Sequence, residues 1–221
     1  MALLIDNDVV HKLCQLDLQD EAIPLLKGKY GSLLVLNTLK FKFIPSNQAK
    51  RKRIEKLYTS IVISRIESFV RSSDVGEFST EVSDSVLLEI LSESDDNLDA
   101  GEMQLLQGII DNSESMMLTG DKRFLKTLGS SKKIVFHIEK IKHSFICFEQ
   151  LILFLIDSEG FDYVKKKFLN ALQGNIKVDT TLMHCFEGRE LAMEERVVDN
   201  LSLNIGYIEK EGSGFLLYQC S

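Results

Sequence analysis

Leu3-Leu4-Ile5-Asp6-Asn7-Asp8 is the stretch that decides the fold. Its three apolar residues are typical of a short strand buried on both faces. Val9, Val10, Leu13 and Leu16 follow at roughly helical spacing. The chain therefore begins with a strand, an acidic loop and a helix.

The same alternation continues along the chain. Further buried strands are predicted at residues 33–36, 116–119 and 134–136. Helices are predicted near 48–70, 83–91, 99–110, 122–128, 144–157 and 160–173. Strands that alternate with helices favour a parallel sheet covered on both faces. We therefore expect an α/β fold, a three-layer α/β/α sandwich whose central, mostly parallel sheet has four to five strands. We place this domain at 1–140 and expect 141–221 to be a mainly helical C-terminal extension, packed on it or forming an oligomer surface.

Composition allows a sizeable core, because 44% of the 221 residues are hydrophobic. The net charge of -7 argues against nucleic-acid binding by the chain as a whole. The charge is segregated, however. Residues 28–54 contain seven basic and no acidic side chains, whereas 74–102 contain ten acidic and no basic ones. A basic segment can hold phosphates and an acidic one can hold metal, although both patterns also suit solvated surfaces.

The four cysteines, at 14, 147, 185 and 220, are far apart and form no C-x-x-C pair. This spacing argues against a zinc site or a disulfide framework and favours a reducing compartment. The first residues lack the basic start of a signal peptide, and the most apolar window, 145–156, is shorter than a membrane span. We therefore expect a cytoplasmic protein without a membrane partner.

Three acidic residues lie where predicted strands end or helices begin. Asp6 ends the first strand, Asp121 follows the third, and Glu102 lies in the first turn of a helix. In open parallel sheets, active sites gather outside the carboxyl ends of the strands. Crowded carboxylates repel one another unless a cation compensates them, and oxygen ligands without Cys or His suit Mg²⁺ or Mn²⁺. Two such ions could support hydrolysis of a phosphodiester.

Each acid also has a structural interpretation. Asp6 or Asp8 could cap the first helix. Asp99 and Glu102 have the spacing of a capping box, and capping is the preferred role for Asp99. Asp121 could be a turn residue after Gly120.

Three short motifs resemble the PIN-domain nuclease family. They are Leu4-Ile5-Asp6-Asn7-Asp8, Leu98-Asp99-Ala100-Gly101-Glu102 and Leu118-Thr119-Gly120-Asp121-Lys122-Arg123-Phe124, and the resemblance covers about residues 1–140. It implies a PIN-like nuclease domain and a Mg²⁺- or Mn²⁺-dependent endoribonuclease, with Asp6, Glu102 and Asp121 as metal-binding catalytic residues. Asp8, Asp99 and Thr119 would be auxiliary.

The resemblance also implies partners. RNA phosphates would contact basic side chains of the first half of the chain, namely Lys40, Lys42, Lys50, Arg51, Lys52 and Arg53. Many family members are toxins or defence nucleases restrained by an antitoxin-like inhibitor protein, and a homodimer is a further expectation. The family's usual additional acid is missing after the second strand. Glu55 or an acid within 84–89 would replace it, or the site is reduced.

Two other functions compete with this one. Asp6-Asn7-Asp8-Val9 matches the opening motif of haloacid dehalogenase-like phosphatases, in which the first Asp attacks phosphorus and the second protonates the leaving group. A PIN-like fold that has lost an acid could instead bind RNA or a protein without cutting. Metal-stimulated RNA cleavage would separate the nuclease from the binding module, and phosphate release from a small phosphomonoester would identify the phosphatase.

Overall fold

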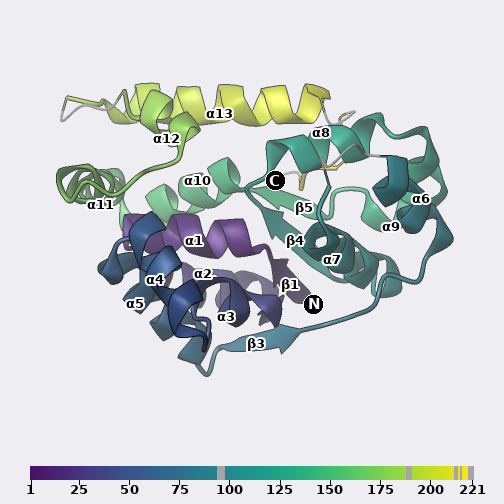
Figure 1. Cartoon of the computed structure of the whole chain (residues 1–221). Coiled ribbons are helices and arrows are strands. Elements are labelled where there is room, and N and C mark those ends of the chain that lie inside the picture. Colours follow the sequence, from purple (N-terminus) through teal and green to yellow (C-terminus); the bar gives the residue numbers. More distant parts are fainter. Residues whose placement is uncertain (94–97, 188–190, 212–213, 215, 219–221) are drawn as a thin grey trace.

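A computed structural model describes residues 1–93, 98–187, 191–211, 214 and 216–218 of the chain. Its centre is a five-stranded, all-parallel sheet in the order β3-β2-β1-β4-β5 (Figure 1). The strands are β1 (Ala2–Ile5), β2 (Ser32–Leu36), β3 (Val75–Phe78), β4 (Met116–Thr119) and β5 (Phe145–Cys147). The predicted α/β class and parallel sheet are confirmed.

Side chains of the central strands alternate between two cores, as the two-residue period of a strand requires. Leu3 and Ile5 of β1 enter one hydrophobic cluster, whereas Leu4 enters the other. Met117 of β4 likewise enters the second cluster, and Leu118 enters the first. Both faces are buried, which is why these strands are apolar throughout.

Helices form the two outer layers. Elements that bury side chains in the first cluster are α1 (Asn7–Leu16), α2 (Gln19–Tyr30), α3 (Thr38–Phe43), α5 (Ser60–Arg71), α10 (Phe148–Glu159), α11 (Phe161–Gln173) and α12 (Thr180–Cys185). The elements that bury side chains in the second hydrophobic cluster are α6 (Ser85–Glu93), α7 (Ala100–Asp111), α8 (Lys122–Ser130), the 3₁₀ helix η1 (Lys132–His137) and α9 (Ile138–Ile141). The long helix α13 (Glu194–Glu211) contributes to both clusters and contacts α8, α10 and α12. The helix α4 (Gln48–Leu57) buries none of its residues.

Two features of the sheet differ from the sequence prediction. The predicted strand at 134–136 is wrong, because this segment lies in η1 and exposes Val135 and Phe136 while burying only Ile134. The edge strand β3 was not predicted, since Gly76 and Glu77 interrupt its apolar residues. The last strand is β5, which precedes α10 inside the segment predicted as a helix over 144–157. The sheet thus takes one strand from the region beyond residue 140.

The helix predicted over 48–70 is divided into α4 and α5. Tyr58 has an extended backbone, and the Thr59 hydroxyl caps α5 by accepting a hydrogen bond from the N–H of Val62. Within the described residues, no helix is both long and apolar enough to cross a membrane. Cys14, Cys147 and Cys185 are buried free thiols, and Cys220 lies outside the described part of the chain.

Candidate acidic site at the carboxyl edge of the sheet

Asp6 directly follows the central strand and lies next to the end of β4. Its backbone N–H donates to the Leu118 carbonyl at 2.9 Å, which extends the pairing of β1 with β4. Asp6 occupies the N-cap position of α1, but its side chain makes no capping hydrogen bond. The Asp6 carboxylate therefore does not cap α1 as the capping interpretation proposed, although the backbone N–H of Asp8 in the first turn of α1 lowers the pKa of Asp6.

The Asp6 carboxylate is held in a poorly solvated position among other acids. The side chain is buried, with 8% of the residue exposed, and its Oδ2 lies 3.5 Å from the Thr119 hydroxyl that donates to it. Burial, followed by the negative charges of Asp8 and Asp99, raises the pKa of Asp6 to about 6. The nearby Lys42 ammonium opposes this rise in the pKa. Asp6 is thus close enough to two other acids to be repelled by them.

Glu102 and Asp99 form the predicted capping box at the start of α7. The Asp99 carboxylate accepts from the Glu102 N–H at 2.8 Å, and the Glu102 carboxylate accepts from the Asp99 N–H at 2.9 Å. The capping role of Asp99 is confirmed. Glu102 is also buried, and burial raises its pKa to about 8, with further contributions from the charges of Asp99, Asp121 and Asp6. Glu102 therefore takes part in the capping box of α7 and also belongs to a group of neighbouring acids, here called the acidic cluster, that includes Asp6, Asp99 and Asp121.

Asp121 differs from Asp6 and Glu102 because its charge is compensated. It caps α8 by accepting from the N–H groups of Arg123 and Phe124, at 2.8 and 3.2 Å. The Arg123 guanidinium also lies 3.1 Å from its carboxylate. Burial alone would raise the pKa of Asp121, but Arg123 and the two backbone donors outweigh it and lower the pKa. Thr119 links the cluster, because its Oγ1 accepts from the Asp121 N–H at 3.1 Å while its hydroxyl faces Asp6.

Lys12 is a partly buried cation that the sequence prediction missed. Its ammonium lies 2.7 Å from Asp8 and 3.0 Å from Asp179, and it donates to the Gly120 carbonyl at 3.1 Å. Asp8 is one helical turn before Lys12, a spacing at which oppositely charged side chains meet. Asp179 comes from the C-terminal region and could not be placed from local sequence. A second such pair joins the Lys122 ammonium to the buried Glu149 at 2.6 Å.

None of the acids suggested as replacements for the missing family acid acts in this cluster. Glu55 pairs with Arg51 at 3.2 Å on α4. Asp84 caps α6 and faces His137, and Glu89 pairs with Lys133. The acids with the largest electrostatic effect on Asp6 are instead Asp8 and Asp99.

The chemistry of the acidic side chains suits a metal ion, but their arrangement in this conformation does not. Carboxylate oxygens alone suit Mg²⁺ or Mn²⁺. Yet no group of three His, Cys, Asp or Glu side chains in the described ranges is arranged to hold an ion. Asp121 is engaged by Arg123, and Glu102 by the backbone of Asp99. In this conformation the acids do not form a ready ligand set, and cation binding would require side chains to turn.

The predicted phosphate-binding residues lie in two places. Lys42 of α3 is near enough to Asp6 to lower its pKa, whereas the neighbouring Lys40 forms a 2.8 Å ion pair with Glu77. Lys50, Arg51, Lys52 and Arg53 all lie on α4, which has no buried residue. Most of the predicted phosphate-binding cations thus lie on a helix without buried residues, and Lys42 is the one that acts on Asp6.

A hollow of about 380 Å³ lies between the end of α4 and the acidic cluster. One face of α1 contributes Asp8, His11, Lys12 and Gln15, spaced as residues on one side of a helix are. The other lining residues are Leu57, Tyr58, Lys177, Val178, Asp179 and Thr180. The His11 ring lies 4.6 Å from the Tyr58 ring, centroid to centroid, and burial lowers the pKa of His11 to about 4. The hollow therefore presents a neutral imidazole, an aromatic ring, and two lysines beside the carboxylates of Asp8 and Asp179.

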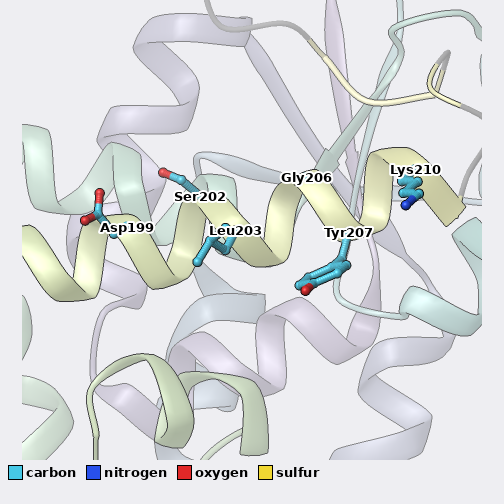
Figure 2. A pocket seen from close by; sticks show the side chains of 6 residues that line it. All are labelled: Asp199, Ser202, Leu203, Gly206, Tyr207 and Lys210. Carbon is cyan, nitrogen blue, oxygen red and sulfur yellow. The ribbon is translucent and has the colours of Figure 1, made fainter.

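A larger open depression, of about 660 Å³, lies on α13 and contains none of the predicted site residues (Figure 2). Comparisons with family models, with curated proteins and with solved structures find no match to this chain.

Proposed function

We propose that the chain is a divalent-metal-dependent endoribonuclease whose site includes Asp6, Glu102 and Asp121. The observation that carries the proposal is the close approach of buried acids at the carboxyl edge of the sheet. Asp6 and Glu102 are both nearly inaccessible, and each has a raised pKa to which neighbouring acids contribute. The three motifs that resemble PIN nucleases supply these same acids.

The electrostatics favour uptake of a cation. Like charges in a poorly solvated place destabilise one another, and a divalent ion between them would reverse the sign of that interaction. Oxygen donors select Mg²⁺ or Mn²⁺ over metals that prefer nitrogen or sulfur. Within the metal-bound enzyme, the ion would supply an activated water for phosphodiester hydrolysis. Perturbed pKa values in adjoining acids are typical of functional sites, although structural networks produce them too.

The basic surface supports RNA as the substrate class. The cations of α4 are accessible to phosphates because the helix has no buried residue, although Arg51 already pairs with Glu55 and Glu67. This helix ends at Leu57 and Tyr58, which line the hollow that reaches Asp8. An aromatic ring in such a hollow offers a base a stacking surface. The buried free thiols fit the proposed reducing, cytoplasmic setting.

A non-catalytic RNA-binding module is the second candidate function. Two ion pairs within the chain favour the binding module, because Arg123 pairs with Asp121 and Lys12 pairs with Asp8. Such pairing partly neutralises the acids without any metal. The phosphatase alternative uses Asp6 and Asp8, but the Asp8 carboxylate already forms a 2.7 Å ion pair with Lys12.

The proposal is tested by incubating labelled structured and unstructured RNAs with the protein in Mn²⁺, Mg²⁺ or chelator. The comparison is an Asp6→Asn, Asp121→Asn double variant, since Asn preserves side-chain shape and can still cap α8. Cleavage that requires metal and disappears in the folded variant is the expected result. Retention of RNA without cleavage under any metal would favour the binding module. Phosphate release from a phosphomonoester, without RNA cleavage, would favour the phosphatase.

A further inference from the structure

One face of α13 is exposed along three helical turns. The face, here called the α13 stripe, consists of residues at the spacing of one helix side: Asp199, Ser202, Leu203, Gly206, Tyr207 and Lys210. Leu203 is 61% exposed and Tyr207 is 66% exposed. The opposite side of the same helix is buried through Val197, Leu201 and Ile208. Opposite its buried face, the helix therefore carries an uncovered face with two large apolar side chains, Leu203 and Tyr207.

The stripe is chemically ordered along its length. Asp199 lies toward one end and Lys210 toward the other, with Leu203 and Tyr207 between them (Figure 2). Neither charged side chain forms an ion pair with any residue in the described part of the chain. Ser202 and Gly206 are small and one turn apart, so another helix could approach closely at this point.

We propose that the α13 stripe docks antiparallel on the α13 stripe of a second copy of this chain, about a two-fold axis. A two-fold axis pairs the same patch with itself, so that each contact occurs twice. In one antiparallel register, Asp199 lies opposite Lys210 of the second copy. The same register places Leu203 opposite Gly206 and Tyr207 opposite Ser202. Each large side chain thus meets a small one, and each charge meets its opposite.

This self-complementarity is what selects a second copy as the occupant. A stripe with apolar residues and one sign of charge would fit many acidic or basic partners. Here the charge changes sign across the midpoint of the stripe, and large and small residues exchange places across the same midpoint. An antiparallel copy of the stripe reverses both patterns together. The proposal does not depend on the function of the acidic site.

The first test replaces Gly206 by leucine and measures mass by light scattering during size-exclusion chromatography over a wide range of concentration. A Cβ added at Gly206 meets no atom within 4 Å in the described part of the chain, and the residue is exposed, so the fold should tolerate the substitution. In the dimer it would collide with Leu203 of the second copy. We expect a dissociation constant at least about tenfold higher, as overpacking of an interface implies.

Gly28→Leu is the matched control, because Gly28 is an exposed helical glycine with no atom within 4 Å of an added Cβ. It should leave the dimer unchanged. A wild-type protein that is monomeric at every concentration would overturn the proposal. A dimer that Gly206→Leu does not weaken would overturn it equally.

The second test exchanges charges. Asp199→Lys alone or Lys210→Asp alone places like charges opposite one another at both ends of the stripe, and each should weaken self-association several-fold. A mixture of the two single variants should form heterodimers, because every opposed pair is then attractive. The double variant should dimerise like the wild type. Failure of the mixture to associate more strongly than either variant alone would contradict the antiparallel register.

Discussion

The charge on Glu102 should destabilise the folded protein at neutral and alkaline pH. In the unfolded chain this carboxyl has its ordinary pKa of 4.5, whereas burial and neighbouring acids raise the pKa to about 8 in the folded state. Between these values the folded state binds the extra proton, so the free energy of unfolding falls as the pH rises. Each pH unit corresponds to about 1.4 kcal/mol. The penalty is therefore about 3 kcal/mol at pH 7 and approaches its full size above pH 8.

The substitution that isolates this effect is Glu102→Gln. Glutamine is the same size, has no charge, and can accept the hydrogen bond from the Asp99 N–H that completes the capping box. The variant should match the wild type near pH 4.5 and exceed its free energy of unfolding by about 4 kcal/mol at pH 8. Urea unfolding followed by circular dichroism at several pH values measures this difference. Equal stabilities at pH 8, or a less stable variant, would refute the electrostatic reasoning.

Three other substitutions test the packing and the charges around the site. Gly108→Ala adds a Cβ 2.6 Å from the Phe78 ring, so overpacking should outweigh the better helix propensity of alanine. We expect the free energy of unfolding in urea to fall by about 1–3 kcal/mol. An unchanged free energy of unfolding would mean that α7 can shift to make room. Asp121→Ala removes the cap of α8 and should cost about 1 kcal/mol by the same assay, with Asp121→Asn as the control that keeps most of the cap. Lys12→Met leaves the Asp8 and Asp179 carboxylates without their shared cation and should cost about 2–4 kcal/mol at pH 7. Because Lys12 lowers the pKa of Asp179, this deficit should shrink in acid as the Asp179 carboxyl protonates. A deficit for Lys12→Met that did not change with pH would contradict the electrostatic cause.

The parts of the fold with strong local signals were predictable from sequence. β1 and β4 are apolar on both faces, and each is followed at once by a polar loop, so the placement of Asp6 and Asp121 at one edge followed from the parallel sheet. The capping box at the start of α7 depends on only four consecutive residues, and it was predictable for that reason.

Features set by tertiary packing were not predictable. The apolar run at 134–136 has the composition of a strand, but Val135 and Phe136 face solvent in η1. β3 is held at the sheet edge by pairing with β2 rather than by its own composition. The contact of Lys12 with Asp179 joins distant parts of the chain, and no local pattern encodes it.

Direct binding of Mn²⁺ tests the central claim that Asp6, Glu102 and Asp121 belong to one cation-binding site. Titration calorimetry and electron paramagnetic resonance of Mn²⁺ would be applied to the wild type, to Asp6→Asn and to the remote control Asp84→Asn. We predict that Mn²⁺ binds saturably to the wild type and with unchanged affinity to the Asp84→Asn control. Binding to Asp6→Asn should be at least about tenfold weaker, because the loss of one charged ligand costs more than about 1.4 kcal/mol of binding free energy. Absence of saturable binding to the wild type, or equal binding by Asp6→Asn, would contradict the account.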